Sequence, residues 1–340
     1  MRSRYKTDVG LVRVLYSRSR YAATLFLISL GLGCSSSKRR PIAVIPRTTG
    51  TGLWEPEHQG AEIAAAKFGT RIYWNAPNRE DDIEGQISLV NQVNLSRFSG
   101  LILSPSQALA LMSPVRQAVG RGVPTVVLGS ALPLPAGNGL YYVLNDEDVG
   151  GQLAAERIAT LMNGHGTVLV LGVNPDIAGI MKRARSFERF LSQSYPEIRV
   201  VKRRGTFNTL REQQTAQQAL RENSEATAIV ALMWSSTRAA ISVIKEDTTH
   251  SSVKVIGFDP DGSALSFDTP ILDSVVIEDT RTMAQRAVEI IDLVNRGQSA
   301  PQNVAFSPTL VTRENLNEDL IRKLTDLGPA PYNWDRSRIP

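Results

Sequence analysis

The most specific segment of this chain reads Val255-Ile256-Gly257-Phe258-Asp259. Apolar and small residues are followed here by a carboxylate, which is the pattern of a buried parallel strand that ends at a polar edge of its sheet. In open α/β sheets, ligands bind beyond the carboxyl ends of the strands. We therefore predict a strand over 253–257 and expect Asp259 to lie at a binding edge.

Similar short apolar runs recur along the chain, and helix-like segments separate most of them. The predicted strands are 42–45, 71–74, 101–103, 123–128, 141–144, 167–171, 198–203, 228–232, 253–257 and 273–277. The predicted helices are 54–68, 82–98, 109–119, 148–162, 178–194, 209–222, 235–246 and 280–296. This alternation predicts βαβ units, with parallel sheets covered by helices on both faces. Because the alternation runs twice, we predict two such domains.

The chain begins with a basic segment and an apolar run, and its single cysteine follows. Cys34 comes directly after Gly33, and the apolar run covers 21–32. This order is typical of a secretory signal, and the run is too short for a membrane-spanning helix, which needs about 20 residues. With a cysteine at this boundary, the segment resembles a bacterial lipoprotein signal. That resemblance implies a removable signal over 1–33, lipidation of Cys34 and a tether over 34–40; the alternative is an ordinary secretory signal with an unrelated cysteine.

The positive net charge belongs to this first segment. The formal net charge is +5, but residues 1–33 hold six of the 38 basic residues and one of the 33 acidic residues. The remaining chain has 32 of each and is neutral. A basic surface for nucleic acid is therefore not expected on the mature protein. The 42% apolar content is sufficient for ordinary cores without a disulfide.

Several fragments at strand and helix junctions occur in a characteristic order. They are Val44-Ile45-Pro46 with Trp54 and Gly60-Ala61-Glu62; Leu103-Ser104-Pro105 with 123–127; Asn145-Asp146 with Gly150-Gly151; and 255–259. Together they resemble the type I periplasmic binding proteins of the ribose- and galactose-binding branch, whose core the lac-repressor family shares. The resemblance covers roughly residues 41–312.

This resemblance implies an α/β fold with two doubly wound parallel-sheet lobes joined by three crossovers. The first lobe would hold 41–144 and 280–304, and the second 147–277 and 305–325, with a tail over 326–340. A ligand would bind in the cleft between the lobes, which close by a hinge motion. The family implies neither catalysis nor a cofactor, and we expect a monomer.

The resemblance also marks residues that follow the strands. Arg47 follows the first strand, and its guanidinium could hold a carboxylate, a phosphate or a pair of hydroxyls; a solvated loop arginine is the alternative. Trp54 and Phe207 match aromatic positions of the family and suit the apolar face of a sugar, although either could be a core residue. Asp259 would accept hydrogen bonds from hydroxyls, or cap a helix. Glu278 lies at the second crossover, where a ligand or hinge role is expected.

Three junctions depart from the family's pattern. Gly129-Ser130 stands where the family has Asp-Arg, Met181 stands two residues before Arg183 where it has an arginine, and Met233-Trp234 stands where it has Asn-Asp. These changes remove hydrogen-bonding groups, and unpaired buried polar groups cost about 1–3 kcal/mol each. We therefore expect free ribose to fit poorly, and a larger, partly apolar ligand with an anionic group facing Arg47 to fit better. Thr51, Ser130 and Trp234 complete the predicted ligand-binding residues.

Other chemistry has little support in the sequence. His58, His165 and His250 are scattered, so no zinc site is expected. Gly50-Thr51-Gly52 lacks the third glycine of a dinucleotide-binding loop, and the acid clusters 81–84 and 146–148 lie at predicted helix starts, where the helix dipole favours them.

Two main functions therefore follow from the sequence. The first is an exported, lipid-anchored protein, facing the periplasm or the cell exterior, that delivers a sugar, glycoside, nucleoside or sugar acid to the permease of an ABC transporter. The second is an extracytoplasmic sensor whose closed, liganded form engages a membrane receptor or kinase. A cytoplasmic repressor or an enzyme on this fold is a third, weaker alternative, because an export signal occupies the place of a DNA-binding segment.

Overall fold

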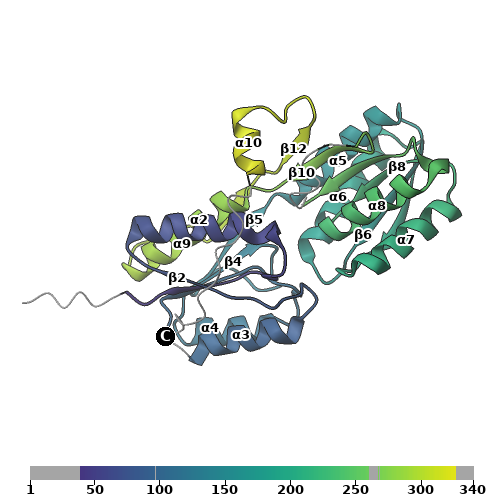
Figure 1. The fold of residues 1–340 in the computed structure, drawn as a ribbon. Coiled ribbons are helices and arrows are strands. Elements are labelled where there is room, and N and C mark those ends of the chain that lie inside the picture. The colour runs from purple at the N-terminus through teal and green to yellow at the C-terminus, as the bar shows by residue number, and fades with distance from the viewer. Residues whose placement is uncertain (1–38, 96, 260–266, 268, 327–340) are drawn as a thin grey trace, which may run out of the picture. The chain divides into compact units, whose positions relative to one another are not determined.

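Two six-stranded sheets form the centre of the protein (Figure 1). The structure is a computed structural model that describes residues 39–95, 97–259, 267 and 269–326. The predicted signal segment, Cys34 and the tail after Asp326 lie outside these residues. None of the helices within the described ranges is long and apolar enough to cross a membrane.

The first sheet has the strand order β11-β5-β4-β3-β1-β2, and all of its pairings are parallel. Its strands are β1 (Ile42–Ile45), β2 (Ile72–Trp74), β3 (Gly100–Leu103), β4 (Thr125–Gly129), β5 (Leu140–Asn145) and β11 (Asn303–Phe306). Helices α2 (Glu55–Phe68) and α9 (Thr280–Asn295) pack on one face. Helices α3 (Ile83–Leu95) and α4 (Met112–Gly120) cover the other face, as Figure 1 shows.

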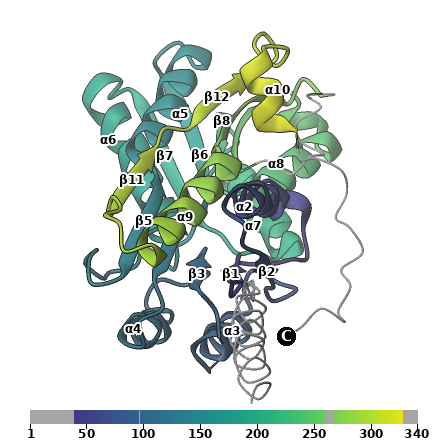
Figure 2. The same ribbon diagram turned by 90° about the vertical axis from the view of Figure 1, so that its left-hand side faces the viewer.

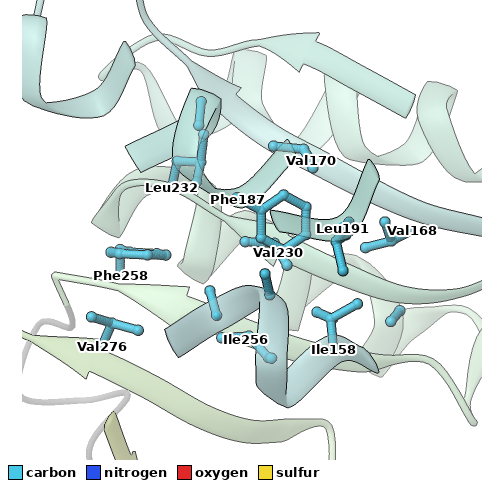
Figure 3. Packing of buried hydrophobic residues seen from close by; sticks show 14 of the residues in the cluster. Ile158, Val168, Val170, Phe187, Leu191, Val230, Leu232, Ile256, Phe258 and Val276 are labelled. Carbon is cyan, nitrogen blue, oxygen red and sulfur yellow. The ribbon is translucent and has the colours of Figure 1, made fainter. Parts of the chain in front are cut away.

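The second sheet has the order β12-β10-β9-β8-β6-β7. Its strands are β6 (Gly166–Val173), β7 (Ile198–Arg204), β8 (Ala226–Ala231), β9 (Lys254–Phe258), β10 (Leu272–Ile277) and β12 (Thr309–Thr312). Only the edge pair β10–β12 is antiparallel among the described pairings. Helices α5 (Glu147–Leu161) and α6 (Ala178–Ser194) pack on one face, through the core that Figure 3 shows. Helices α7 (Thr209–Glu222) and α8 (Trp234–Glu246) cover the other.

Three connections pass from one sheet to the other. They join β5 to α5, β10 to α9, and β11 to β12. Figure 2 shows the last of these, where β11 and β12 follow each other from the first sheet into the second. Two helix-covered, mainly parallel sheets with three crossovers confirm the predicted fold class.

The predicted strands and helices correspond to elements of the structure, with shifts at their ends. The exceptions lie in the last described segment, where no elements were predicted: β11, β12 and helix α10 (Asp319–Thr325). Strand β11 belongs to the first sheet and ends at Phe306, two residues past the limit of 304 that was predicted for that lobe. Two short 3-10 helices, Gly52–Trp54 and Thr248–His250, complete the described elements.

Gly151 allows α5 to lie close against α6. A Cβ atom at this position would lie 2.3 Å from the carbonyl oxygen of Arg183 and 2.8 Å from the backbone nitrogen of Phe187. Beside this contact, the Ser186 hydroxyl donates a hydrogen bond to the carbonyl oxygen of Asp148 at 2.7 Å. The close approach of these two helices therefore sets the position of the Arg183 side chain.

A buried carboxylate connects α2 to the first sheet. Glu57 is fully buried, and its Oε2 accepts a hydrogen bond from the Ser104 hydroxyl at 2.9 Å, just after β3. Burial raises the pKa of Glu57 from 4.5 to about 7, against the lowering effects of Ser104 and Arg47. The folded protein therefore holds this proton more tightly than the unfolded chain does.

We expect Gly151→Ala to lower the free energy of unfolding by about 1–3 kcal/mol, because the added methyl group meets backbone that cannot give way easily. Gly120→Ala is the matched control, since a Cβ atom there meets nothing within 4 Å. Urea and thermal unfolding of the two variants measure the difference. Equal stability of both variants would contradict the close contact between α5 and α6.

Glu57 should also make stability depend on pH. Its raised pKa contributes stability that is fully present below pH 4.5 and is lost as the pH rises to about 7. The loss amounts to about 3 kcal/mol. Glu57→Gln removes this titration, so its unfolding free energy should change less than that of the wild type across the same window. Glu156→Gln, at an exposed position of α5, should follow the wild type; parallel curves for all three proteins would show that Glu57 does not titrate in this window.

Candidate ligand-binding site

A cavity lies where the carboxyl ends of strands from both sheets meet. The lining residues that come one or two positions after a strand end are Arg47, Ser104, Ser130, Glu147, Met233, Asp259 and Glu278, after β1, β3, β4, β5, β8, β9 and β10. Parallel sheets bring such residues together, because the ends of all their strands face the same edge. The cavity therefore combines residues from both lobes with a residue of the second crossover, Glu278.

Seven of the eight residues predicted to bind ligand line this cavity: Arg47, Trp54, Ser130, Phe207, Trp234, Asp259 and Glu278. Thr51 does not; it lies at a neighbouring depression, which Glu80, Phe207 and Trp234 also line. Trp54 lines the cavity and also belongs to the core beneath α2.

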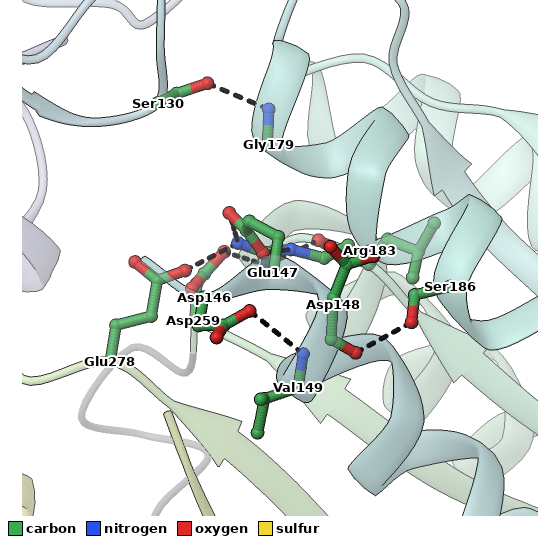
Figure 4. Close-up of polar contacts among 11 residues, drawn as sticks. Ser130, Asp146, Glu147, Asp148, Val149, Gly179, Arg183, Ser186, Asp259 and Glu278 are labelled. Atoms are coloured by element: carbon green, nitrogen blue, oxygen red, sulfur yellow. Dashed lines mark hydrogen bonds and ion pairs between the residues drawn. The ribbon is translucent and has the colours of Figure 1, made fainter. Parts of the chain in front are cut away.

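Arg183 stands at the centre of the polar side of the cavity (Figure 4). Its Nε and Nη2 donate to the two carboxylate oxygens of Glu147, at 2.7 and 2.9 Å. Nη2 also donates to Glu278 at 2.6 Å, and Nη1 donates to Asp259 at 2.9 Å. The fifth N–H reaches the carbonyl oxygen of Leu232 at 3.2 Å. A guanidinium has five N–H groups, so all of them have partners.

The ionisation of this cluster follows from its burial. Burial alone would lower the pKa of Arg183, but the carboxylates of Asp259, Glu147 and Glu278 outweigh it and raise the pKa well above its usual value. For Glu278, burial first and the charge of Asp259 second raise the pKa well above 4.5, against the pull of Arg183. The single positive charge of Arg183 is therefore shared among three carboxylates and cannot neutralise all of them.

The first lobe contributes an aromatic wall and a second buried acid. Trp54 Nε1 donates to Glu80 Oε1 at 2.9 Å, and the guanidinium carbon of Arg47 lies 5.4 Å from the centre of the Trp54 ring. Arg47 Nε donates to the carbonyl oxygen of Pro105 at 3.0 Å, so this arginine is tied to the site rather than free in solvent. Burial raises the pKa of Glu80, while the Arg47 charge lowers it.

Direct contacts cross from the first lobe to the second beside the cavity. The backbone N–H of Gly179, at the start of α6, donates to Ser130 Oγ at 2.9 Å, as Figure 4 shows. The backbone N–H of Ala108 donates to the carbonyl oxygen of Asp176 at 3.1 Å. These bonds hold the two lobes against each other at one side of the cavity.

Some polar atoms in the cavity wall have no hydrogen-bond partner among the described residues. Glu80 Oε2 and Asn145 Oδ1 are acceptors of this kind. Trp234 Nε1 is a donor of this kind, and it lies near enough to Glu80 to lower the pKa of that carboxyl. Glu80 is 4% exposed and Asn145 is 6% exposed, so bulk water hardly reaches them. Buried polar groups are normally paired, and an unpaired one needs an explanation such as a ligand.

Sequence reasoning missed Glu80, Asn145, Glu147 and Arg183 as cavity residues. Arg183 was noted only as a neighbour of Met181, and Glu147 was assigned to a set of acids favoured by the dipole at a helix start. The available signal was Gly151, because a glycine near a helix start allows a second helix to come close. That second helix, α6, contributes Arg183.

Comparisons with known proteins agree with this architecture. A family model described as a periplasmic binding protein domain matches residues 42–299. A curated xylitol-binding protein of Mycolicibacterium smegmatis is 26% identical over 145 residues, which are 42% of this chain. The chain spans 40% of the length of that relative.

Solved structures share the fold. A solute-binding protein of an ABC transporter from Agrobacterium vitis, bound to α-D-tagatopyranose, has a TM-score of 0.79 and 20% identity, with 84% of this chain and 99% of that chain covered. A carbohydrate-transporter solute-binding protein from Agrobacterium radiobacter, in complex with D-arabinose, has a TM-score of 0.78 and 22% identity, with coverages of 85% and 100%. Because the domain match begins at β1 and runs past the end of α9 through both sheets, the chain belongs to the periplasmic binding protein domain family.

Proposed function

We propose that this protein captures a small, polyhydroxylated, sugar-like ligand between its two lobes and delivers it to an ABC transporter. The observation that supports this most is the cavity itself, whose walls come from both lobes and hold buried polar atoms without partners. Hydroxyl groups of a ligand would donate to Glu80 Oε2 and Asn145 Oδ1. The named ligands of the similar proteins are xylitol, tagatose and arabinose, which all carry several hydroxyls.

The cavity has the mixture of surfaces that a sugar or polyol requires. Trp54, Phe207 and Trp234 supply aromatic faces for the C–H side of such a ligand. Asp259 and Glu278 supply acceptors for hydroxyl groups. Proteins of this family bind solutes rather than transform them, and we propose no catalytic role for these carboxylates.

We also propose that Cys34 carries a lipid that holds the mature protein at a membrane surface, with the binding lobes outside the cytoplasm. The family is extracytoplasmic, and the order of basic segment, apolar run and cysteine supports export followed by lipidation. The permease of the transporter would then meet the protein at the same membrane.

Asp259→Asn should weaken binding of xylitol, D-arabinose or whichever neutral polyol binds best by about tenfold. The amide loses the charge that accepts hydrogen bonds most strongly, while Asn tolerates the left-handed backbone at this position, where φ is 49°. Isothermal titration calorimetry measures the change. Glu156→Gln, at an exposed site on α5 of the same lobe that does not line the cavity, should bind as the wild type does. If both variants bind equally well, the ligand site lies elsewhere.

Cys34→Ser should abolish the lipid anchor. Cells that express the wild-type chain with labelled palmitate should show label in the protein and recover it with the membranes. The serine variant should carry no label and should appear in the soluble extracytoplasmic fraction. Label that survives the substitution, or a wild-type chain without label, would overturn the anchor and leave the binding function in place.

A further inference from the structure

The cavity holds more acidic than basic groups. Four carboxylates line it: Glu80, Glu147, Asp259 and Glu278. Two guanidiniums, Arg47 and Arg183, also line it. A further carboxylate, Glu57, lies buried behind Ser104, and the charge of Arg47 lowers its pKa. The acids come from both lobes and from the crossover, so the excess is a property of the whole cavity.

Arg183 has no free N–H group with which to bind an anion. Its five N–H groups are donated to Glu147, Asp259, Glu278 and the carbonyl oxygen of Leu232. Its face lies against the Phe258 ring, with 4.6 Å between the guanidinium carbon and the ring centre. An incoming carboxylate or phosphate would have to displace one of these carboxylates from a residue that is 3% exposed.

Arg47 is also balanced by acids. The charge of Arg47 lowers the pKa of Glu57, Glu80 and Glu278, so its positive charge stabilises the ionised form of each of these carboxylates. Its Nε is donated to Pro105, and its guanidinium packs over Trp54. The sequence-based idea of an anionic ligand group facing Arg47 is therefore unfavourable, because such a group would add a further negative charge near the carboxylates whose pKa values Arg47 already lowers.

An independent observation points to a ligand rich in donors. The unpartnered acceptors of the wall, Glu80 Oε2 and Asn145 Oδ1, are both more than nine-tenths buried. A carboxylate accepts hydrogen bonds, and it accepts them most strongly from a charged donor. An ammonium group has three N–H donors and no acceptor, so it matches a wall of this composition better than any neutral group.

We propose that the ligand of this cavity is a polyol or sugar that carries a protonated amine, held among Glu80, Asp259 and Glu278. This inference rests on the proposed binding function and names its ligand class. Hydroxyl groups of the ligand meet the remaining acceptors and the aromatic walls, while the ammonium supplies the positive charge that the two arginines do not. Burial is the largest cause that raises the pKa of Glu80 and of Glu278, and the charge of Asp259 raises both further. An ammonium group between these carboxylates would favour their charged forms.

The test is a set of matched ligands that differ in one group. Isothermal titration calorimetry at low salt compares D-glucose, D-glucosamine, N-acetyl-D-glucosamine and D-glucuronate, then the same four forms of D-galactose. Sorbitol and 1-amino-1-deoxysorbitol provide an open-chain pair. In at least one series the amine should bind about tenfold more tightly than its neutral parent. N-acetylation, which removes the charge, should remove that gain, and the uronate should bind most weakly.

Variants of the protein test whether the carboxylates cause the preference for amine ligands over neutral ones. Glu80→Gln keeps an acceptor for the Trp54 indole and removes the charge, so the ratio of amine to neutral affinity should fall at least about threefold. Glu84→Gln, at an exposed site on α3, should leave the ratio unchanged. A ratio that is unchanged in Glu80→Gln would overturn the role of that carboxylate. The ligand series on the wild type decides the proposal even if the Glu80 variant does not fold.

The outcomes separate the two proposals. If neutral sugars or sorbitol bind and the amines bind no more tightly, the ligand class is wrong and the proposed function stands. If the uronates bind most tightly, the ligand class is wrong as well. If no compound of these series binds but xylitol or D-arabinose does, the ligand class is wrong and the proposed function stands. If none of these compounds binds, the proposed capture of sugar-like ligands fails together with the inference.

Discussion

The site depends on one buried guanidinium. Arg183 lies on α6 and forms ion pairs with carboxylates at the start of α5, the end of β9 and the end of β10. A buried ion pair that loses one partner leaves an uncompensated charge, which is strongly destabilising. The geometry of three separate segments is therefore linked through one side chain. Glu278 extends this link to the crossover that leads into α9 and the first lobe.

The close contact between α5 and α6 places Glu147 and Arg183 next to each other. Gly151 brings the backbone of α6 against α5, and Gly179 leaves the space that the Glu147 carboxylate occupies, since a Cβ there would lie 2.4 Å from its Oε1. The core of Figure 3, with Phe187 and Phe258 among its largest buried residues, fixes both helices on the sheet. Packing thus positions the acids, and the acids then fix the arginine.

The central strands could be predicted from the sequence because each contains a short apolar run, as in Ile42–Ile45. Strands β11 and β12 could not, because they are four-residue edge strands with several partly exposed positions. For the same reason, the sequence could place residues that follow the strands at one edge of the sheets, where the cavity lies. Arg183 was missed because it lies on a helix, where the side that faces the cavity depends on how the helix is rotated and packed. Glu147 comes two residues after β5, but it also begins α5, and an acid at a helix start is expected there without any ligand.

Neither lobe is a continuous piece of chain. The first sheet lacks its edge strand β11, and the core beneath α2 lacks α9, until residues 280–306 are present. During synthesis, the second sheet can therefore assemble most of its strands while the first still exposes an apolar face. The growing chain therefore remains partly unfolded until residues 280–306 have been made, and the completion of the first lobe is delayed to the end of synthesis.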